Sequence, residues 1–532
     1  MNPHNHMNYS SLARPTLTVI MPFYCVEKYI AEAISSVLNS SYRDLELLLI
    51  DDGSLDDSVI IADEFCRNDT RATVIRQENR GLGAARNTGF SYARGKFIHF
   101  MDSDDIVDSS FYTSAIESLE LSGSDLLVAP SLRLAANDAI DVGTSLDEVF
   151  KNSRSGITIH DYPELLRYQS AWGRIYNREF AHKIDLKYPE GIWFEDQQPA
   201  VESYLLAKSI DILNSPGILY RVVASSITGN RVEVRYIQEL SSALHSAFST
   251  VYELGSSEIV NLWLRMQIGQ VITLLRIKQN ISNVDYITIA IHLLHFLDQQ
   301  LSPSEKLKLS TTIRIFLYLI RTATITQVQS YLANGVLDPN KFVLDYHSDN
   351  MKPLFSWPGV TDCIPPSMLV PKNYEIPVQV SYSEITSTDQ ADELTLNVAC
   401  SLSLGRDSIK HARWILKLTP TKGGREILLN TSVLRLNMNE ENRVQSDWVI
   451  SAILGQNFIS YVNSTNWTNG EYYIALEITI GKLTIARKVS FDHDLHVETF
   501  EVGNSVGISV HDDGSSTALL KISKHIIHPY FC

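Results

Sequence analysis

The sequence predicts a multidomain protein in which an α/β region is followed by a helical region and then by a C-terminal β-sandwich. Three patterns predict this division of the 532 residues. Strand-like and helix-like segments alternate over residues 17–105, apolar residues recur at spacings of three and four from about residue 232, and apolar and polar residues alternate after residue 378. A chain of this length has room for roughly three or four domains.

The boundaries between these regions follow from changes in composition. Six of the 18 prolines lie within residues 353–377, which marks a linker. The expected parts in chain order are a flexible N-terminus (1–15), an α/β catalytic domain (16–231), a helical domain (232–350), a proline-rich linker (351–377) and a sandwich of immunoglobulin-like size (378–532), with an additional small β unit from about residue 497.

The first hundred residues predict four strands connected by three helices. Near-continuous apolar runs are typical of strands that helices cover on both faces, and such connections favour a largely parallel sheet with right-handed crossovers. The expected strands are 17–22, 45–50, 72–76 and 97–101, and the expected helices are 27–39, 54–67 with Ser54 as N-cap, and 83–93. In such sheets, ligands bind at the carboxyl ends of the strands.

The mixed pattern continues to about residue 230. The expected strands are 125–128 and 210–214, and the expected helices are 162–168, 178–182 and 199–207.

Helical spacing then dominates up to about residue 350. The segment Ser302-Pro303-Ser304-Glu305 combines an N-cap, a proline at the first helical position and a capping-box glutamate. Beyond the linker the period becomes two, as in residues 394–402 and 472–480, which predicts strands of a sandwich.

Two acidic turns follow strands of the α/β region. Asp102-Ser103-Asp104 comes directly after the strand 97–101, and Asp51-Asp52 ends the strand 45–50. Carboxylate oxygens are ligands of hard divalent cations, and magnesium and manganese share such ligands with phosphates. The turns therefore predict an enzyme that holds a nucleotide diphosphate through a metal.

A glycine-containing segment, ENRGLGAARN at residues 78–87, precedes the third helix. Gly81 and Gly83 are suited to a tight turn into that helix. A dinucleotide fingerprint needs a third glycine where Arg86 stands, and it should follow the first strand rather than the third. We therefore exclude a nicotinamide cofactor and expect Arg86 to point into a nucleotide cleft.

Together these segments resemble the donor half of an inverting family 2 glycosyltransferase with the GT-A (Rossmann-like) fold. The resemblance lies in VIMPFYCVEKYIAEAISSVL, LLLIDDGSLDDS and ENRGLGAARNTGFSYARGKFIHFMDSDD. It implies a UDP-sugar donor and a bound Mn²⁺ or Mg²⁺. It also implies roles at the nucleotide: Pro22, Tyr24 and Asp52 at the base and ribose, and Asn79 and Arg86 beside the uracil.

The resemblance extends to the diphosphate. Asp104 with Asp102 is implied to meet the metal, and Ser103 between them belongs to the donor-binding set. Arg221 and Ser226 lie in a segment that resembles the end of the family's catalytic domain, and they are expected to contact the diphosphate when a loop closes.

An inverting transfer also needs a general base for the acceptor hydroxyl. Trp193 and Phe194 precede the acidic pair Glu195-Asp196, a setting that favours a raised carboxylate pKa. The resemblance implies that such a pair carries the base, so we expect Asp196 to be the base and Glu195 to support it. The alternative is that these acids only begin the helix after them.

Composition excludes several other classes of protein. A net charge of −16 argues against nonspecific nucleic-acid binding. Five scattered cysteines fit a reducing cytoplasm rather than a disulfide framework. The apolar stretches 260–277 and 313–325 are interrupted by polar or charged residues, so we expect no transmembrane segment and a cytoplasmic protein, peripheral at the inner face of the membrane.

The overall plan is similar to that of the wall teichoic acid N-acetylglucosaminyltransferases. It implies a hexosyl- or N-acetylhexosaminyltransferase with a bacterial surface glycan, lipid-linked or teichoic-acid-like acceptor, and a homo-oligomer, a trimer, formed through the C-terminal β module. Two alternatives stay open: a glycan-binding scaffold with a relic transferase domain, and a sugar nucleotidyltransferase.

Overall fold

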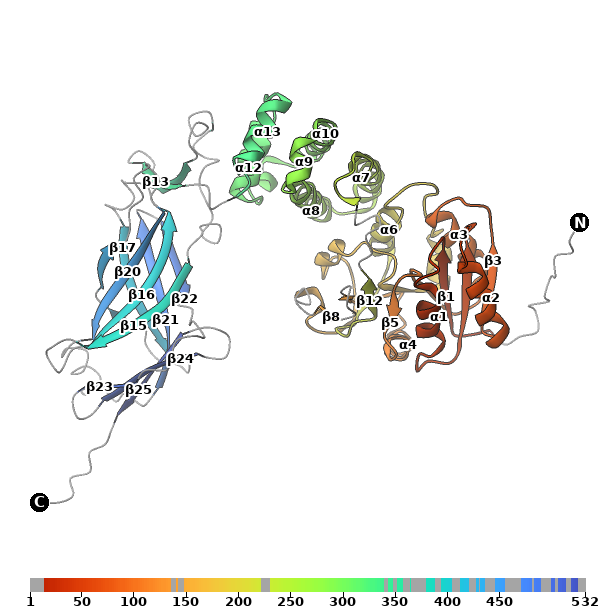
Figure 1. Ribbon diagram of the computed structural model, residues 1–532, viewed down its shortest axis with the longest axis horizontal. Helices are drawn as coiled ribbons and strands as arrows, with labels where there is room; N and C mark the ends of the chain where they lie inside the picture. Colours follow the sequence, from red (N-terminus) through yellow and green to blue (C-terminus); the bar gives the residue numbers. More distant parts are fainter. Residues whose placement is uncertain are drawn as a thin grey trace, which may run out of the picture. The chain divides into compact units, whose positions relative to one another are not determined.

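The computed structural model describes residues 14–134, 140–141, 148–221, 230–338, 343–347, 352–356 and 364, and the C-terminal strands given below (Figure 1). The chain forms two compact units, Met1–Glu305 and Lys306–Cys532. Ser226 lies outside the described residues.

The first unit contains an eight-stranded sheet with the order β3-β2-β1-β4-β10-β6-β11-β9. The pairs β1–β2, β2–β3, β1–β4 and β6–β11 are parallel, so the predicted parallel arrangement is confirmed for the first four strands. β10 runs antiparallel between β4 and β6. The strands are β1 (Leu17–Phe23), β2 (Leu45–Asp51), β3 (Ala72–Arg76), β4 (Phe97–Phe100), β6 (Leu126–Val128), β9 (Arg154–Ile157), β10 (Arg174–Asn177) and β11 (Ile210–Ile212).

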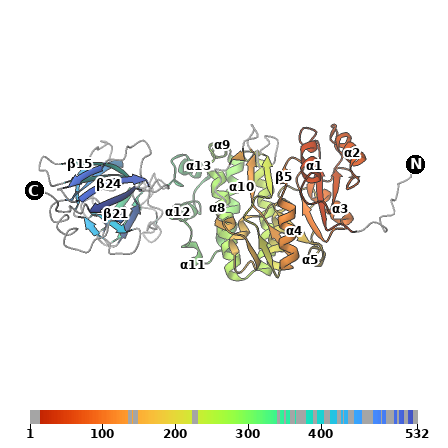
Figure 2. The same ribbon diagram turned by 90° about the horizontal axis from the view of Figure 1, so that it is seen from below.

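Strands β1, β2 and β3 extend the sheet in one direction, and β4 then pairs on the other side of β1. Because of this reversal, helices cover both faces of the sheet. Right-handed crossovers place α1 (Ile30–Leu38) and α2 (Ser58–Asn68) on one face of the sheet and α3 (Leu82–Tyr92) on the other, as Figure 2 shows. Every residue of β1 and β2 is buried between these layers. The reversal leaves the ends of β1 and β4 at a topological switch point, where ligands bind in sheets of this kind.

One predicted helix start differs from the structure. The second helix begins at Ser58 rather than Ser54. The Asp51 carboxylate accepts a 2.9 Å hydrogen bond from Ser54 N–H, and the Ser54 hydroxyl accepts a bond from the backbone of Cys25. Ser54 therefore belongs to the turn after β2, because its polar groups are already used there.

The strands and helices predicted between residues 125 and 214 have counterparts in the structure, but β9, β10 and the strands of a second sheet were not predicted. Residues 178–182 lie in α5 (Arg178–Lys183), residues 199–207 largely in α6 (Gln197–Leu206), and residues 162–168 form a short 3-10 helix, Pro163–Arg167. A second sheet has the order β5-β12-β7-β8, with β5 (Ile106–Val107), β12 (Ile218–Arg221), β7 (Ser131–Leu134) and β8 (Ile140–Asp141).

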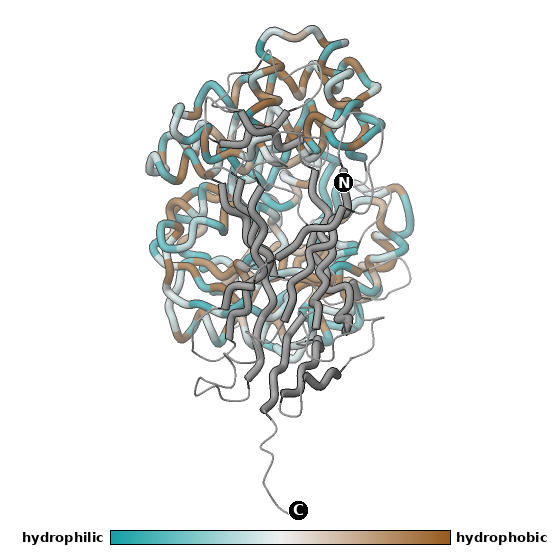
Figure 3. The backbone as a smooth tube through the Cα atoms, turned by 90° about the vertical axis from the view of Figure 1, so that its left-hand side faces the viewer, coloured by the Kyte–Doolittle hydropathy of each residue, from teal (hydrophilic) through white to brown (hydrophobic). Residues whose placement is uncertain are grey.

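Helices follow the two sheets, and hydrophilic and hydrophobic stretches alternate along them (Figure 3). They are α7 (Val234–Leu254), α8 (Ser257–Leu275), α9 (Lys278–Ser282), α10 (Val284–Gln300), α11 (Pro303–Lys306), α12 (Thr311–Leu319) and α13 (Ile325–Ala333). The helix start at Ser302 is confirmed, because its hydroxyl accepts a bond from Glu305 N–H, although α11 is only four residues long. Among the described helices, none is long and apolar enough to cross a membrane.

The helical pattern predicted up to residue 350 is wrong for its last part. Val343–His347 is a strand, β13, which pairs antiparallel with β14 (Lys352–Ser356). The residues Val343, Leu344 and Tyr346 favour a strand, and the short register with β14 supplies the backbone partners.

The C-terminal residues form strands, as the alternating pattern predicts. Residues 394–402 lie in β16 (Leu394–Ser403) and 472–480 in β21 (Gly470–Ile480). One sheet has the order β15-β16-β20-β19, with β15 (Gln379–Ser387), β20 (Gln445–Leu454) and β19 (Thr431–Arg435). The other has the order β18-β17-β21-β25-β24-β23, with β22 also paired to β21; its other strands are β17 (Ala412–Pro420), β18 (Ile427–Leu429), β22 (Leu483–Lys488), β23 (Thr499–Val502), β24 (Val506–Asp512) and β25 (Ala518–Lys524).

Candidate active site

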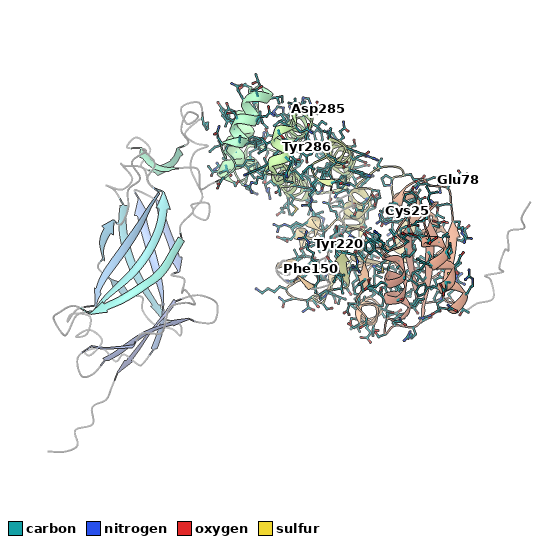
Figure 4. The ribbon with its side chains drawn as sticks, viewed as in Figure 1. Cys25, Glu78, Phe150, Tyr220, Asp285 and Tyr286 are labelled. Atoms are coloured by element: carbon teal, nitrogen blue, oxygen red, sulfur yellow. The ribbon has the colours of Figure 1, made fainter. Side chains whose placement is uncertain are left out.

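The two acidic turns lie at the same edge of the large sheet. β1 and β2 are in register with Pro22 opposite Ile50, so Tyr24 and Asp52 follow neighbouring strand ends. The turn that begins at Asp102 follows β4 on the other side of β1. Figure 4 shows Cys25 and Glu78, which follow the ends of β1 and β3, at this edge. The structure thus brings together the residues expected around the nucleotide.

Asp52 is buried, and its carboxylate accepts hydrogen bonds from the backbone of the glycine-containing segment. Its Oδ1 accepts bonds from Gln77 Nε2 at 2.7 Å and Arg80 N at 3.0 Å, and its Oδ2 accepts one from Gly81 N at 2.8 Å. Gly81 has a φ of 87°, a conformation that favours glycine. Asp52 therefore sets the path of the chain that leads into α3.

Of the other residues expected at the nucleotide, two have exposed side chains and one is buried. Tyr24 is 45% exposed. Asn79 is exposed, and its backbone N would lie 3.2 Å from a Cβ added at Gly53. Pro22 is buried inside β1.

Arg86 connects the acidic turn to the acidic pair near α6. It is only 2% exposed, and its Nη2 donates a 2.8 Å bond to Oδ1 of Asp102 while its Nη1 donates to Oε1 of Glu195. Burial lowers the pKa of Arg86, but the carboxylates of Asp102 and Glu195 outweigh burial and raise it above its usual value. In this structure the guanidinium is therefore paired with two carboxylates, those of Asp102 and Glu195.

The carboxylates that follow Asp102 are crowded and poorly solvated. Burial, together with the charge of Asp102, raises the pKa of Asp104 to about 6. Burial also raises the pKa of Asp105 well above its usual value. Oδ1 of Asp105 accepts a 2.8 Å bond from Arg221 N, whereas its buried Oδ2 has no hydrogen-bond partner within the described part of the chain. Ser103 is buried within the same turn.

This donor set fits a hard divalent cation. Asp102 and Asp104 offer oxygen ligands, and a cation would favour the ionised form of Asp104, which burial and the charge of Asp102 disfavour. Among the described residues, no three His, Cys, Asp or Glu side chains are grouped so that they could hold a metal ion alone.

Glu195 and Asp196 end a loop of residues 186–196, called the base loop below. Asp196 stands at the N-cap position of α6, but its side chain makes no capping hydrogen bond. Burial, and then the charge of Glu195, raises the pKa of Asp196 to about 7. The helix-start alternative also places an acidic residue at this position, but the Asp196 carboxylate is not bound to the helix amides as a capping group would be.

The backbone before this pair is strained. Phe194 has a φ of 60°, which is uncommon for a residue with a bulky side chain. Its ring contacts Tyr236 of α7 edge to face, with centroids 5.0 Å apart, and the guanidinium of Arg235 lies 4.3 Å from the centroid of the Trp193 ring. Helix α7 thus holds the end of the base loop.

Arg221 ends β12 and is anchored beside the acidic turn. Its Nε donates to the carbonyl of Asp104 at 3.1 Å, and its Nη2 lies 2.7 Å from Oε2 of Glu32. The sequence does not single out Glu32. Ser226, expected with Arg221 on the diphosphate, falls outside the described residues.

Sequence reasoning also missed Asn87 and Tyr188. The Asn87 side chain donates to Tyr188 O and accepts from Tyr188 N, both at 2.8 Å. Asn87 lies inside the ENRGLGAARN segment, but 101 residues separate it from its partner. No local pattern signals such a pair, because only the fold brings the two segments together.

Comparisons with known proteins agree with the geometry. Residues 18–184 match the model of glycosyl transferase family 2. The chain is 30% identical over 222 residues to the glycosyltransferase EpsJ of Bacillus subtilis, a match that covers 40% of this chain and 63% of EpsJ, so the chain spans less than two thirds of that relative.

Two solved structures share the fold. The crystal structure of TarS from S. aureus matches 96% of this chain and 86% of TarS at 17% identity with a TM-score of 0.56. The structure of TarS 1–349 in complex with UDP-GlcNAc matches 65% of this chain and 97% of that chain at 18% identity with a TM-score of 0.51. At these identities the likeness concerns the fold.

Proposed function

We propose that this chain, whose residues 18–184 form a glycosyl transferase family 2 domain, is an inverting glycosyltransferase that moves a sugar from a UDP-sugar to an acceptor hydroxyl. One observation carries the proposal: Arg86 joins Asp102 of the acidic turn to Glu195, the neighbour of Asp196. The expected donor site and the expected base are therefore parts of one connected charge network, as a transfer between two bound substrates requires.

The base is Asp196. Its pKa of about 7 keeps a substantial fraction ionised near neutral pH while leaving the carboxylate basic enough to accept a proton. The acceptor hydroxyl loses its proton to this carboxylate as the oxygen attacks the anomeric carbon from the face opposite the diphosphate. Glu195 supports this role, because its negative charge raises the proton affinity of Asp196.

The donor is held by the strand ends. Asp52, through its bonds to Arg80 N and Gly81 N, shapes the segment that borders the uracil, and Tyr24 and Asn79 lie at the same edge. Asp104 and Asp102 would hold Mn²⁺ or Mg²⁺, which supplies charge neutralisation for the diphosphate and for the departing UDP. Arg221, whose Nε donates to the carbonyl of Asp104, would contact the diphosphate.

We also propose an acceptor substrate and an oligomeric state for this protein. The shared fold with TarS and the overall plan support a surface glycan or teichoic-acid-like acceptor, used at the inner face of the cell membrane. We propose a catalytic domain over residues 16–231 and a C-terminal domain over residues 378–532, whose strands form an immunoglobulin-like module that assembles a homotrimer.

Product analysis tests the function. The full-length protein is incubated with Mn²⁺ and a panel of nucleotide sugars, with a chelator control, and the released nucleotide is identified. Free UDP released from a UDP-sugar is the expected product. Release of pyrophosphate would identify a nucleotidyltransferase instead, and binding without turnover would favour a glycan-binding scaffold.

A further inference from the structure

The base loop is held by α3 as well as by α7. The carboxamide of Asn87 forms a paired interaction with the backbone of Tyr188: Nδ2 donates to the carbonyl and Oδ1 accepts from the amide, both at 2.8 Å. A backbone carbonyl only accepts and an amide N–H only donates, so the orientation of the carboxamide is determined by its partners. The pair ties the start of the base loop to α3 at one rigid point.

Neighbouring contacts show how close this docking is. A Cβ added at Gly83 would lie 1.9 Å from the carbonyl oxygen of Pro189, so the backbone of α3 touches the loop directly. The Tyr188 ring lies under the guanidinium of Arg86, with 5.2 Å between the guanidinium carbon and the ring centroid. Helix α3 therefore determines the path of the base loop. It also carries Arg86, whose guanidinium binds Glu195 at the end of that loop.

Asn87 does not belong to the predicted donor, metal or base residues. Its side chain faces the backbone of residue 188, eight residues before Asp196, and neither partner atom is a reacting group. Its carboxamide acts through the loop. Because Phe194 has a strained backbone, the loop depends on such external contacts to keep its conformation.

We propose that Asn87 is a positioning residue for sugar transfer: its carboxamide clamps the base loop to α3 and so keeps Asp196 at the reacting hydroxyl. This inference rests on the proposed function for its catalytic consequence. Displacement of a reacting group by about 1 Å costs up to about 100-fold in rate. Donor binding, which uses the strand ends, does not depend on the clamp.

The test compares Asn87→Leu, of similar size but without hydrogen bonds, with a matched control, Asn177→Leu. Asn177 also bonds backbone amides through its side chain, those of Glu179 and Phe180, but it caps α5 and does not touch the base loop. UDP-GlcNAc with Mn²⁺ is the binding probe for calorimetry, and UDP release from the donor that the wild type turns over measures kcat.

Asn87→Leu is expected to lower kcat by about 10- to 100-fold and to change the Kd of UDP-GlcNAc less than twofold. Asn177→Leu is expected to leave both unchanged. An unchanged kcat in Asn87→Leu, or an equal loss in Asn177→Leu, would overturn the proposal. If Asn87→Leu does not fold, Asn87→Ser, whose short side chain cannot reach both backbone groups, takes its place.

A second measurement separates this inference from the proposed function. Amide hydrogen exchange of the unliganded full-length protein is followed by mass spectrometry. Asn87→Leu should speed exchange in peptides covering 186–196 and leave β1 and β2 protected. Lack of UDP release by the wild type would contradict the proposed function alone, whereas unchanged exchange in the base loop would contradict the clamp itself.

Discussion

Arg86 and Asp102 are joined by a 2.8 Å hydrogen bond from Nη2 to Oδ1, and the other terminal nitrogen of the same guanidinium binds Glu195. The cation is almost fully buried, so both carboxylates depend on it for their charge balance. This one side chain therefore connects two acidic segments that lie far apart in the sequence.

Removing the Arg86 cation should destabilise the fold. Arg86→Met leaves the buried Glu195 carboxylate without a counter-charge, which is expected to cost about 3–5 kcal/mol of unfolding free energy. Adding Glu195→Gln to Arg86→Met should recover part of that loss, because the uncompensated charge is then gone. Denaturant unfolding measures the free energy of unfolding of both variants.

Lys96→Met, which breaks the exposed Lys96–Glu120 pair, is the control and should change stability by less than about 1 kcal/mol. Equal losses in the two single variants would contradict the assigned role.

Asp196→Asn should retain donor binding and lose transfer. The amide has nearly the same shape as the carboxylate but cannot accept the proton, so kcat is expected to fall at least 100-fold, the lower range of general-base contributions. The Kd of the donor, measured by calorimetry, should change little. Near wild-type turnover in this variant would show that the base lies elsewhere.

The rate of transfer should depend on pH through Asp196. The general base works only when ionised, and the pKa of Asp196 is raised to about 7. Turnover is therefore expected to rise as pH increases from 5 through 7, where about half of the base is ionised, and to level off at about pH 8. A pH series of kcat at saturating donor measures this, with donor binding recorded at each pH. A rate that is independent of pH between 5 and 8 would refute this assignment.

Asp104→Ala should abolish metal-dependent binding of the UDP-sugar. The carboxylate of Asp104 supplies an oxygen ligand, and its loss leaves the diphosphate without part of its charge neutralisation. Calorimetry with and without Mn²⁺ should show a metal-dependent gain in affinity for the wild type and no gain for the variant. A chelator should reduce the wild type to the behaviour of the variant. Unchanged metal dependence in Asp104→Ala would place the cation at other residues.

Asp52→Ala should weaken donor binding without removing the base. The carboxylate accepts bonds from Arg80 N and Gly81 N, and its loss leaves those amides without their partner. The donor Kd should rise by at least about tenfold, the equivalent of 1.4 kcal/mol, while the pH dependence of kcat at saturating donor stays the same. A shifted pH profile with unchanged Kd would contradict this division of roles.

Much of the candidate site is predictable because its signals are local. Asp52 and Asp102 directly follow apolar strands, and the parallel order of those strands places them at one edge. The contacts that complete the site are different. Asn87 meets Tyr188 across 101 residues, and Arg86 meets Glu195 across 109, so no window of sequence contains both partners.

The errors have a similar cause. Serine is a common N-cap residue, but the N–H and hydroxyl of Ser54 form hydrogen bonds with Asp51 and Cys25, and α2 starts later. Competition of this kind between side chains and backbone is decided by neighbours that come together only in the folded chain.

The position of Phe194 has a consequence for how activity arises during synthesis. Its left-handed backbone costs roughly 1–3 kcal/mol, and the ring that offsets this strain packs on Tyr236, forty-two residues further along the chain. A nascent polypeptide that has emerged only as far as residue 184 contains the whole segment that matches the family, yet has neither the acidic pair nor the helix that supports it. Enzymatic competence would thus appear only after α7 has left the ribosome, and not when the segment that matches the family is complete.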